Sequence, residues 1–430
     1  MPEVAAQVEV RLWGRRVGAL VELDTGPIVF EYAPEFGRAG LEISPIRLPL
    51  RLRGPLRFDE LRNSPAFAGL PGVLADSLPD AFGNKVIRAY FAARGRESAA
   101  LSPVQRLLYV GERALGALTY HPAEPVPDRA GELQALEIAD LVRDARRIIE
   151  GTPDVTIPEI YRIGSSAGGM RPKAVVLFNP GTHRIRSGFA DASPGDVSAI
   201  LKFDGVGDGS TPGQLGVPLP FNRIEAAYAR MAAGAGIAVT EVQVLEDGGY
   251  AHLLIRRFDI ASSGERLHQH TFGGLVHVDY NHPGASSYEE YLRAVLELGM
   301  PYASLEEGYR RAVFNVLAVN QDDHVKNLSF HMDPLGRWSL TPAYDLTFAK
   351  GHGWTAQHQM RVQGRTAGIR LEHLLGLAGD LGISRPQRVI DQVRSAVATW
   401  PVHAGELDIG PESVRRIQDE LIARDREVFG

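Results

Sequence analysis

The chain has 430 residues, of which 44% are hydrophobic and 23% charged, a composition typical of a globular protein with two or three domains. The net charge of -6 gives no overall basic character, so charge alone does not indicate direct nucleic-acid binding. The absence of cysteine excludes disulfides and thiolate metal sites. The sequence has no signal-peptide pattern and no apolar run near the roughly 20 residues of a membrane helix, so we expect a cytoplasmic protein without a membrane partner.

The first third of the sequence predicts a β-rich domain. Residues 8–13 alternate between apolar and polar, and the alternation resumes after a turn, so we expect an antiparallel meander. The expected elements are strands at 8–13, 17–23, 28–32 and 116–120, and helices at 73–83, 85–95 and 102–110. A proline-rich segment at 122–127 predicts the boundary of this domain, which we place at residues 1–124.

Residues 125–258 predict a nucleotide-binding lobe. A strongly periodic helix is expected at 133–149, a glycine-rich turn at 164–169, strands at 174–178, 199–203 and 252–259, and an amphipathic helix at 218–233. Small residues with consecutive amides allow such a turn to bind phosphate oxygens. Lys202 is a single cation in an apolar strand. It either faces solvent on an edge strand or, in a kinase-like lobe, binds the α- and β-phosphates and could pair with Glu225.

The same glycine-rich turn contains the Gly-x-Ser-x-Gly pattern of the nucleophile elbow of α/β-hydrolases. An elbow needs an apolar strand before it and a helix after it. Here Pro158 interrupts the approach, and Pro172 stands where the helix would run. The context therefore argues against a hydrolase.

Residues 259–430 predict a mainly helical lobe with a polar loop at 320–327. The expected helices lie at 288–298, 305–319, 371–381, 388–399 and 411–425. Asp322 and Asn327 have the Asp-x-x-x-x-Asn spacing of the protein-kinase catalytic loop, and Asp345 follows a strand–turn–strand pattern as the second metal-binding Asp of kinases does. We predict Asp322 as the base for a hydroxyl nucleophile, and Asn327 and Asp345 as oxygen ligands of Mg²⁺.

Other roles are open for the residues of this loop. Asp, His and Asn side chains often form turns and cap helices. We interpret Asp323 as structural, whereas His324 either orients Asp345 or caps the loop. A zinc site made of Asp323, His324 and a distant histidine lacks a supporting pair of ligands in the sequence.

Several segments together resemble one known family. They are G-S-S-A-G-G-M-R-P-K-A at 164–174, A-I-L-K-F-D at 199–204, I-R-R-F-D at 255–259, R-A-V-F-N-V-L-A-V-N-Q-D-D-H-V-K-N at 311–327 and L-T-P-A-Y-D at 340–345, with V-E-V-R-L-W-G-R-R-V-G-A-L at 8–20 and F-A-G-L-P-G-V-L-A-D-S-L-P-D at 67–80. They are similar to HipA-type serine/threonine kinases, the toxins of HipA–HipB toxin–antitoxin pairs. The resemblance covers almost the whole chain.

The resemblance implies an α+β fold, in which a β-rich N-terminal domain docks on a protein-kinase-like body of two lobes. One lobe is mixed and β-rich and binds the nucleotide, and the other is mainly helical. It also implies ATP and Mg²⁺ as cofactors. The implied cofactor-binding residues are Ser166, Ala167, Gly168, Gly169, Lys202 and Asn327, with Arg256 and Phe258 at the hinge near adenine. Arg256 departs from the family pattern, in which this position is acidic.

The resemblance further implies regulation and partners. Ser165 would be autophosphorylated, which switches the kinase off, with Ser166 as the second choice, and Lys173 and His324 would support the site. Family toxins phosphorylate glutamyl-tRNA synthetase, which blocks tRNA charging and causes growth arrest and persistence. A HipB-like DNA-binding antitoxin is the usual partner, so DNA would be contacted only through the antitoxin complex.

Two other functions are compatible with parts of the sequence. A nucleotide-binding regulatory subunit of a DNA-binding repressor complex would need no base, so the joint presence of Lys202, Asp322, Asn327 and Asp345 argues against it. A small-molecule kinase on a similar lobe would differ in its acceptor pocket, which no sequence pattern identifies.

Overall fold

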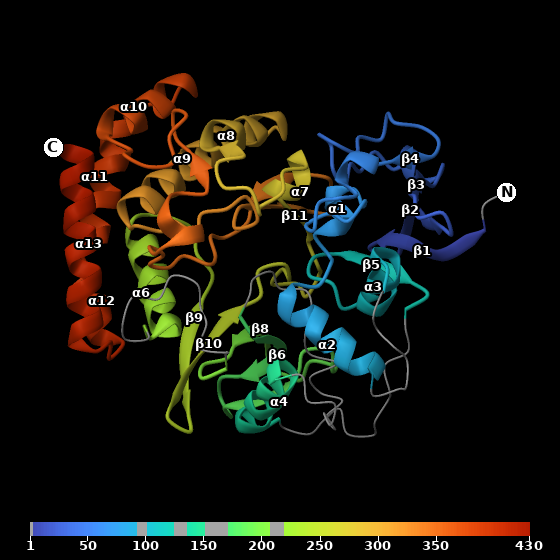
Figure 1. Ribbon diagram of the computed structural model, residues 1–430, viewed down its shortest axis with the longest axis horizontal. Helices are drawn as coiled ribbons and strands as arrows, with labels where there is room; N and C mark the ends of the chain where they lie inside the picture. The colour runs from blue at the N-terminus through green and yellow to red at the C-terminus, as the bar shows by residue number, and fades with distance from the viewer. Residues whose placement is uncertain (1–2, 93–100, 124–135, 151–170, 207–218) are drawn as a thin grey trace.

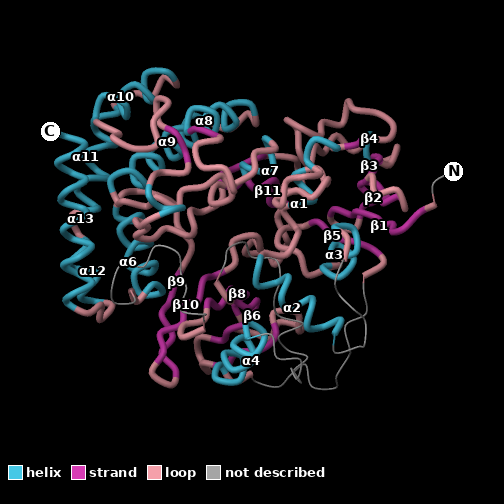
Figure 2. Tube along the Cα trace, in the orientation of Figure 1, coloured by secondary structure: helices cyan, strands magenta, loops and turns pink. Residues whose placement is uncertain are grey.

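The computed structural model describes residues 3–92, 101–123, 136–150, 171–206 and 219–430. Figure 1 shows three parts: an N-terminal sheet, a second sheet beside α2 and α4, and a body of helices near the C-terminus. Strands gather in the first two parts and helices in the third, as Figure 2 shows by colour. This is the predicted α+β architecture, a two-lobed kinase-like body carrying a β-rich N-terminal domain.

The N-terminal part is a five-stranded sheet whose neighbouring strands are antiparallel. In spatial order the strands are β4 (Leu56–Arg57), β3 (Ile28–Tyr32), β2 (Arg15–Leu23), β1 (Val4–Leu12) and β5 (Leu118–His121). Alternation in β1 places Val8, Val10 and Leu12 in a core shared with α1 (Gly72–Ala75) and α3 (Pro103–Val110). Two short 3-10 helices, η1 (Phe36–Arg38) and η2 (Asp59–Leu61), complete this part. The predicted meander is confirmed.

The helix predicted at 73–83 is wrong as a single element. It divides into α1, which ends at Ala75, and α2 (Ala81–Ala92). Pro79 lacks the amide and has the ring that break a helix interior, so the chain leaves the helix before it. Asp80 then begins α2, because its Oδ1 accepts a hydrogen bond from the amide of Gly83 at 2.6 Å, which is the geometry of an N-cap.

The second part is a five-stranded antiparallel sheet. Its strands in spatial order are β7 (Arg184–Ser187), β6 (Lys173–Asn179), β8 (Val197–Lys202), β10 (Tyr250–Arg256) and β9 (Val242–Asp247). Helices α2 and α4 (Ile138–Glu150) share a hydrophobic core with β6 and β8. Helix α2 therefore precedes this lobe in the sequence but packs into it.

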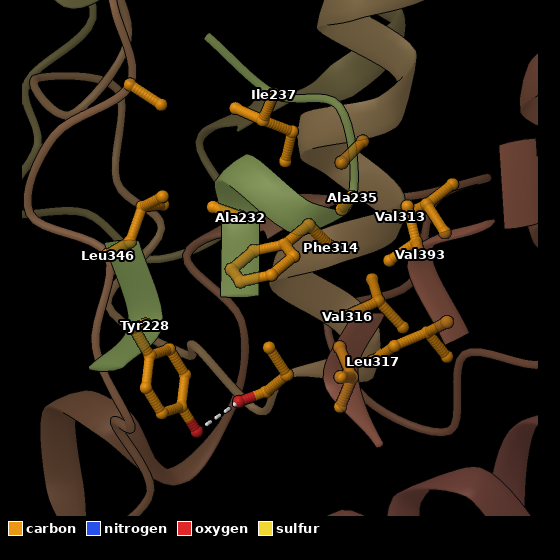
Figure 3. Packing of buried hydrophobic residues seen from close by; sticks show 14 of the residues in the cluster. Tyr228, Ala232, Ala235, Ile237, Val313, Phe314, Val316, Leu317, Leu346 and Val393 are labelled. Atoms are coloured by element: carbon orange, nitrogen blue, oxygen red, sulfur yellow. Dashed lines mark hydrogen bonds between the residues drawn. The ribbon is translucent and has the colours of Figure 1, made fainter. Parts of the chain in front are cut away.

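The third part contains α7 (Phe272–Val276), α8 (Tyr288–Glu297), α9 (Tyr302–Leu317), α10 (Leu371–Asp380), α11 (Pro386–Val397), α12 (Trp400–Glu406) and α13 (Pro411–Phe429). Its core also includes α6 (Phe221–Gly234), which the sequence places in the nucleotide lobe. Figure 3 shows Tyr228 of α6 near Phe314 of α9, and the Tyr228 hydroxyl donates to the carbonyl oxygen of Ala318 at 2.8 Å. This bond fixes α6 to the chain just before the loop at 320–327.

The remaining described strands form two small sheets. One has the order β11 (His268–Thr271), β13 (Ser329–Met332) and β14 (Trp338–Leu340), and the other pairs β12 (Ser286–Ser287) with β15 (Met360–Arg361). A 3-10 helix, η3 (Gly353–Ala356), lies between β14 and β15 in sequence. Across the described ranges, none of the helices has both the length and the apolar character that crossing a bilayer requires.

Candidate active site

The loop at 320–327 is anchored to the end of α9. The side-chain amide of Asn320 donates to Asn315 Oδ1 at 2.9 Å, and the backbone amide of Gln321 donates to the carbonyl of Ala349 at 2.9 Å. Asn320 and Gln321 are both buried. The loop therefore has a defined conformation, fixed by contacts with segments on both sides of it in the sequence.

Asp322 is held by contacts at its carboxylate and at its backbone. The indole N–H of Trp354 donates to Asp322 Oδ1 at 2.6 Å, and the side-chain amide of Asn327 donates to the Asp322 carbonyl oxygen at 2.9 Å. Burial raises the pKa of the Asp322 carboxyl, while a charged His324 and the Trp354 hydrogen bond act in the opposite direction. Asp322 is thus an oriented carboxyl with a pKa above the ordinary aspartate value.

Asp323 faces the interior. It is 1% exposed, and its carboxylate accepts hydrogen bonds from the Tyr288 hydroxyl at 2.8 Å and from the Gln359 amide at 2.7 Å. His358 Nδ1 lies 3.1 Å from the same carboxylate. These contacts anchor the loop to α8 and to the segment that precedes β15. In the part of the chain that the structure describes, no three His, Asp or Glu residues gather as a set of metal ligands.

Lys202 joins the two lobes through two carboxylates. Its Nζ lies 2.6 Å from Glu225 Oε1 on α6 and is also ion-paired with Asp345. Burial alone would lower the pKa of Lys202, but Asp345 and Glu225 hold it above the ordinary lysine value. Burial raises the pKa of Glu225, which the charge of Lys202 opposes. The pairing of Lys202 with Glu225, suggested by the sequence, is present.

Asp345 follows the hairpin of β13 and β14, as the sequence predicted. Its backbone is left-handed, with φ of 53°, a conformation that Asp tolerates better than most residues. Its side chain is 28% exposed, so a ligand can reach it. Burial would raise the pKa of Asp345, but Lys202, and less strongly Lys173, hold it below the usual aspartate range.

His324 packs between two aromatic rings. Its ring centroid lies 5.4 Å from that of Tyr280 and 6.3 Å from that of Trp354. Its Nδ1 accepts a hydrogen bond from the Lys326 amide at 3.2 Å, so it caps its own loop. Burial lowers the pKa of His324, while the carboxylates of Asp322 and Asp345 act against this effect.

Lys173 begins β6 and is ion-paired with Asp80 at 3.2 Å. The guanidinium of Arg171 lies 3.9 Å from the centroid of the Phe221 ring at the start of α6. Burial lowers the pKa of Arg171, and Glu225, Asp345 and Asp322 raise it. The cations and the carboxylates of the two lobes therefore form one connected electrostatic site.

A small hollow with about 20 Å³ of free space, partly open to solvent, lies beside this site. It is lined by Glu225, Ala229, Val239, Thr240, Val242, Ile255, Ala343, Tyr344, Asp345 and Leu346. Its mainly apolar wall next to charged groups suits a ligand with one flat apolar end and one anionic end.

Two of the predicted cofactor-binding residues do not line this hollow, and their place near adenine stays a prediction. Among the described residues that line the hollow, neither Arg256 nor Phe258 is included. The Arg256 side chain is 53% exposed and lies 3.7 Å from Glu241. Phe258 stacks on Tyr344, with ring centroids 5.4 Å apart. Phe258 thus contacts Tyr344, which lines the hollow, without lining the hollow itself.

The glycine-rich turn lies outside the described residues. The expected positions of Ser165, Ser166, Ala167, Gly168 and Gly169 all fall within residues 151–170, which the structure does not describe.

Sequence patterns did not identify Trp354, Asp80 or the apolar residues lining the hollow. Trp354 and Asp322 are 32 positions apart, and the segment between them ends in an irregular loop. Asp80 lies far from Lys173 in the sequence, since the two residues are 93 positions apart. The one available signal for Asp80 was its place before a helix with Gly83 three residues later, which indicates a cap and nothing more.

The lobes, the lysine–carboxylate network and the loop carrying Asp322 define a protein with a kinase-like fold. Residues 8–121 match the family model for the HipA N-terminal domain, and residues 165–400 match the HipA-like C-terminal domain. The chain therefore belongs to the HipA family, as the sequence motifs indicated.

One curated protein and one solved structure are similar to almost the whole chain. A protein of Sinorhizobium fredii named "Putative kinase Y4dM" is 26% identical over 93% of this chain and 92% of its own length. The fold is similar to that of HipA in the Shewanella oneidensis complex of HipA, HipB and operator DNA, with a TM-score of 0.65. That similarity has 19% identity and covers 98% of this chain and 97% of the other.

Proposed function

We propose that this protein is an ATP- and Mg²⁺-dependent serine/threonine protein kinase of the HipA toxin type. The observation that carries the proposal is the ion-pair network of Lys202 with Glu225 and Asp345, next to the oriented carboxylate of Asp322. In protein kinases, a lysine paired with a helix glutamate binds phosphates, and two acidic loops supply a base and a metal ligand. Here Lys202 and Glu225 would be the lysine–glutamate pair, and Asp322 and Asp345 would be the base and the metal ligand.

Each part of ATP has a counterpart in the site. The adenine would lie against the hollow lined by Val239, Thr240 and Ile255. The phosphates would extend towards Lys202, whose ammonium is held by Glu225. Bound ATP would supply the transferable γ-phosphate.

The residues also suit Mg²⁺, which prefers a few protein oxygens completed by phosphate and water. Asp345 offers an accessible carboxylate with a depressed pKa, so it is ionised at neutral pH. Asn327 uses its amide nitrogen to bond the Asp322 carbonyl, which leaves its oxygen as the ligand atom. A bound Mg²⁺ would neutralise charge on the phosphates.

Asp322 would act as the base. Its Oδ1 is fixed by the indole N–H of Trp354, so its second oxygen can accept the proton of an incoming hydroxyl group. A carboxyl with a raised pKa is a stronger base once ionised, which suits proton acceptance near neutral pH. His324 supports this arrangement by capping the loop.

Substrate, regulation and partner follow from the family resemblance. The proposed acceptor is a serine of a protein, with glutamyl-tRNA synthetase as the first candidate, and phosphorylation of it would inhibit growth. Autophosphorylation of Ser165 would switch the kinase off by placing a doubly charged group in the phosphate-binding turn. A HipB-like antitoxin would bind the kinase and carry it to DNA. The HipA of Shewanella oneidensis has been solved in such a complex.

Incubation of the purified protein with γ-labelled ATP, Mg²⁺ and a cell extract tests the proposal. We expect label on a protein band and on serine after hydrolysis of that band. Omission of Mg²⁺ should abolish the transfer. Label on a small molecule alone would contradict a protein kinase, and the absence of any transfer would contradict a phosphotransferase.

A further inference from the structure

Asp80 uses its two carboxylate oxygens for two different partners. Oδ1 accepts the amide of Gly83 at 2.6 Å and caps α2, and Oδ2 lies 3.2 Å from Lys173 Nζ. The side chains of Asp80 and Lys173 are 9% and 7% exposed. Burial raises the pKa of the Asp80 carboxyl, while the Lys173 charge and the Gly83 amide oppose this effect. The helix cap thus directs the second oxygen at the lysine.

Lys173 and Lys202 are direct neighbours across the sheet. The antiparallel register pairs Lys173 of β6 with Lys202 of β8, so their side chains extend from the same face. Like charges directly opposite each other are destabilising, and each lysine has its own counter-charge. Glu225 and Asp345 balance Lys202, and Asp80 lies against Lys173. The two lysines thus lie opposite each other beside the proposed phosphate site.

The Lys173 charge acts on the same carboxylate as Lys202. Lys202 is ion-paired with Asp345, and the sheet register places Lys173 directly beside Lys202. A triphosphate bound between Lys202 and Asp345 would also come within range of Lys173.

Asp80 is held in place by the packing of α2 on the nucleotide lobe. Phe82, Val86 and Ile87 of this helix belong to the same hydrophobic core as Val176 and Leu201 of the sheet. The helix comes from the N-terminal third of the chain, yet Asp80, which precedes its first residue, is ion-paired with Lys173 of the nucleotide lobe. The N-terminal third of the chain thus supplies one side of the charged site.

We propose that Asp80 is a positioning residue for phosphoryl transfer, which holds the Lys173 ammonium beside Lys202 so that both contact phosphate oxygens. This inference rests on the proposed function. Asp80 would act through Lys173 and would not touch the nucleotide. Loss of the Asp80 charge would remove one restraint on the buried Lys173 ammonium, so Lys173 would be held less firmly beside the phosphates.

The variant Asp80→Asn removes the charge and keeps a capping oxygen, because Asn is as good an N-cap as Asp. We expect kcat for phosphotransfer to fall about tenfold, and the Kd for inorganic tripolyphosphate, measured by calorimetry, to rise about fivefold. In a Lys173→Met background, both effects of Asp80→Asn should shrink to less than about twofold, because the group through which Asp80 acts is gone. Asp80→Ser, which also caps, repeats the test if Asn weakens folding.

Trp13→Phe is the matched control. The Trp13 indole donates to the carbonyl of Arg266 at 2.6 Å, so this variant removes a contact between the N-terminal sheet and the body far from the lysine pair. Trp13→Phe should change neither kcat for phosphotransfer nor the Kd for tripolyphosphate. Equal effects of Asp80→Asn in both lysine backgrounds, or no effect at all, overturn the inference.

The two proposals fail in distinguishable ways. Transfer by the wild-type protein without Asp80–Lys173 coupling refutes the positioning role and leaves the kinase assignment standing. Coupled tripolyphosphate binding without any transfer supports the positioning role and refutes the kinase. A wild-type protein that neither binds tripolyphosphate nor transfers phosphate refutes both.

Discussion

Replacing Trp354 by phenylalanine should move the pH dependence of the reaction to higher pH. The substitution keeps an aromatic ring beside His324 and removes the indole N–H that donates to Asp322 Oδ1 at 2.6 Å. That bond stabilises the ionised carboxylate, so its loss favours the protonated form and raises the pKa further above the ordinary aspartate value. Because the base must be ionised, activity would begin at a higher pH.

The size of the shift follows from the strength of the bond. A hydrogen bond to a charged group contributes about 1.5–3 kcal/mol, and one pKa unit corresponds to about 1.36 kcal/mol. Water can replace part of the lost bond, because Trp354 and Asp322 are only half-buried. We therefore expect the acid limb of the profile to shift upward by about one pH unit, the lower end of this range.

The assay is kcat/KM for phosphotransfer measured across the acid limb, for the wild type, Trp354→Phe and the control Trp13→Phe. The control loses an indole bond of the same length to a backbone carbonyl, so it reports any general effect of removing an indole. The four indole N–H signals in an NMR spectrum provide a second readout, since that of Trp354 should titrate with Asp322. An unchanged acid limb in Trp354→Phe, or an equal shift in the control, would refute the reasoning.

Three further predictions concern the metal site, the phosphorylated serine and the N-terminal part of the chain. Asp345→Ala should abolish the tightening of ATP binding by Mg²⁺, and calorimetry that finds the same Mg²⁺ dependence in both proteins would remove Asp345 from the metal site. Mass spectrometry after incubation with ATP and Mg²⁺ should find phosphate on Ser165, at a rate that rises with protein concentration; unmodified Ser165 and Ser166 would rule out this switch. A protein beginning at residue 150 would lack α2 and expose the core it covers, so we expect it to aggregate in sedimentation, and a monomeric fragment that binds ATP would contradict this.

Elements with a regular apolar–polar periodicity were predicted well from the sequence. The prediction failed at prolines, because a proline can either interrupt a helix or begin one. The alternation of Val8, Val10 and Leu12 marked a strand because each residue faces one core. Pro79 divided a predicted helix, whereas Pro401 stands in the first turn of α12, a helix that the sequence did not predict. A proline at a helix start is favourable and one inside a helix is not, so only the surrounding contacts distinguish them.

The site was predictable to the extent that it lies within short loops. The spacing of Asp322 and Asn327 and the hairpin before Asp345 are local patterns, and the structure brings these residues to one cleft with Lys202. Trp354 and Asp80 meet their partners only through tertiary packing, which no spacing rule describes. The adenine contacts expected at Arg256 and Phe258 come from the resemblance alone and stay a prediction; neither residue lines the described hollow.

Transfer of the γ-phosphate by Asp322→Asn tests the central claim most directly. The purified wild type and variant would be compared for transfer of label from γ-labelled ATP to protein, with ATP affinity measured in parallel. We predict that the variant binds ATP as the wild type does and that its transfer rate falls by roughly 10²–10⁴, the range typical for loss of a general base. A variant that binds ATP and transfers phosphate at the wild-type rate would contradict the assignment of this cleft as a kinase active site with Asp322 as its base.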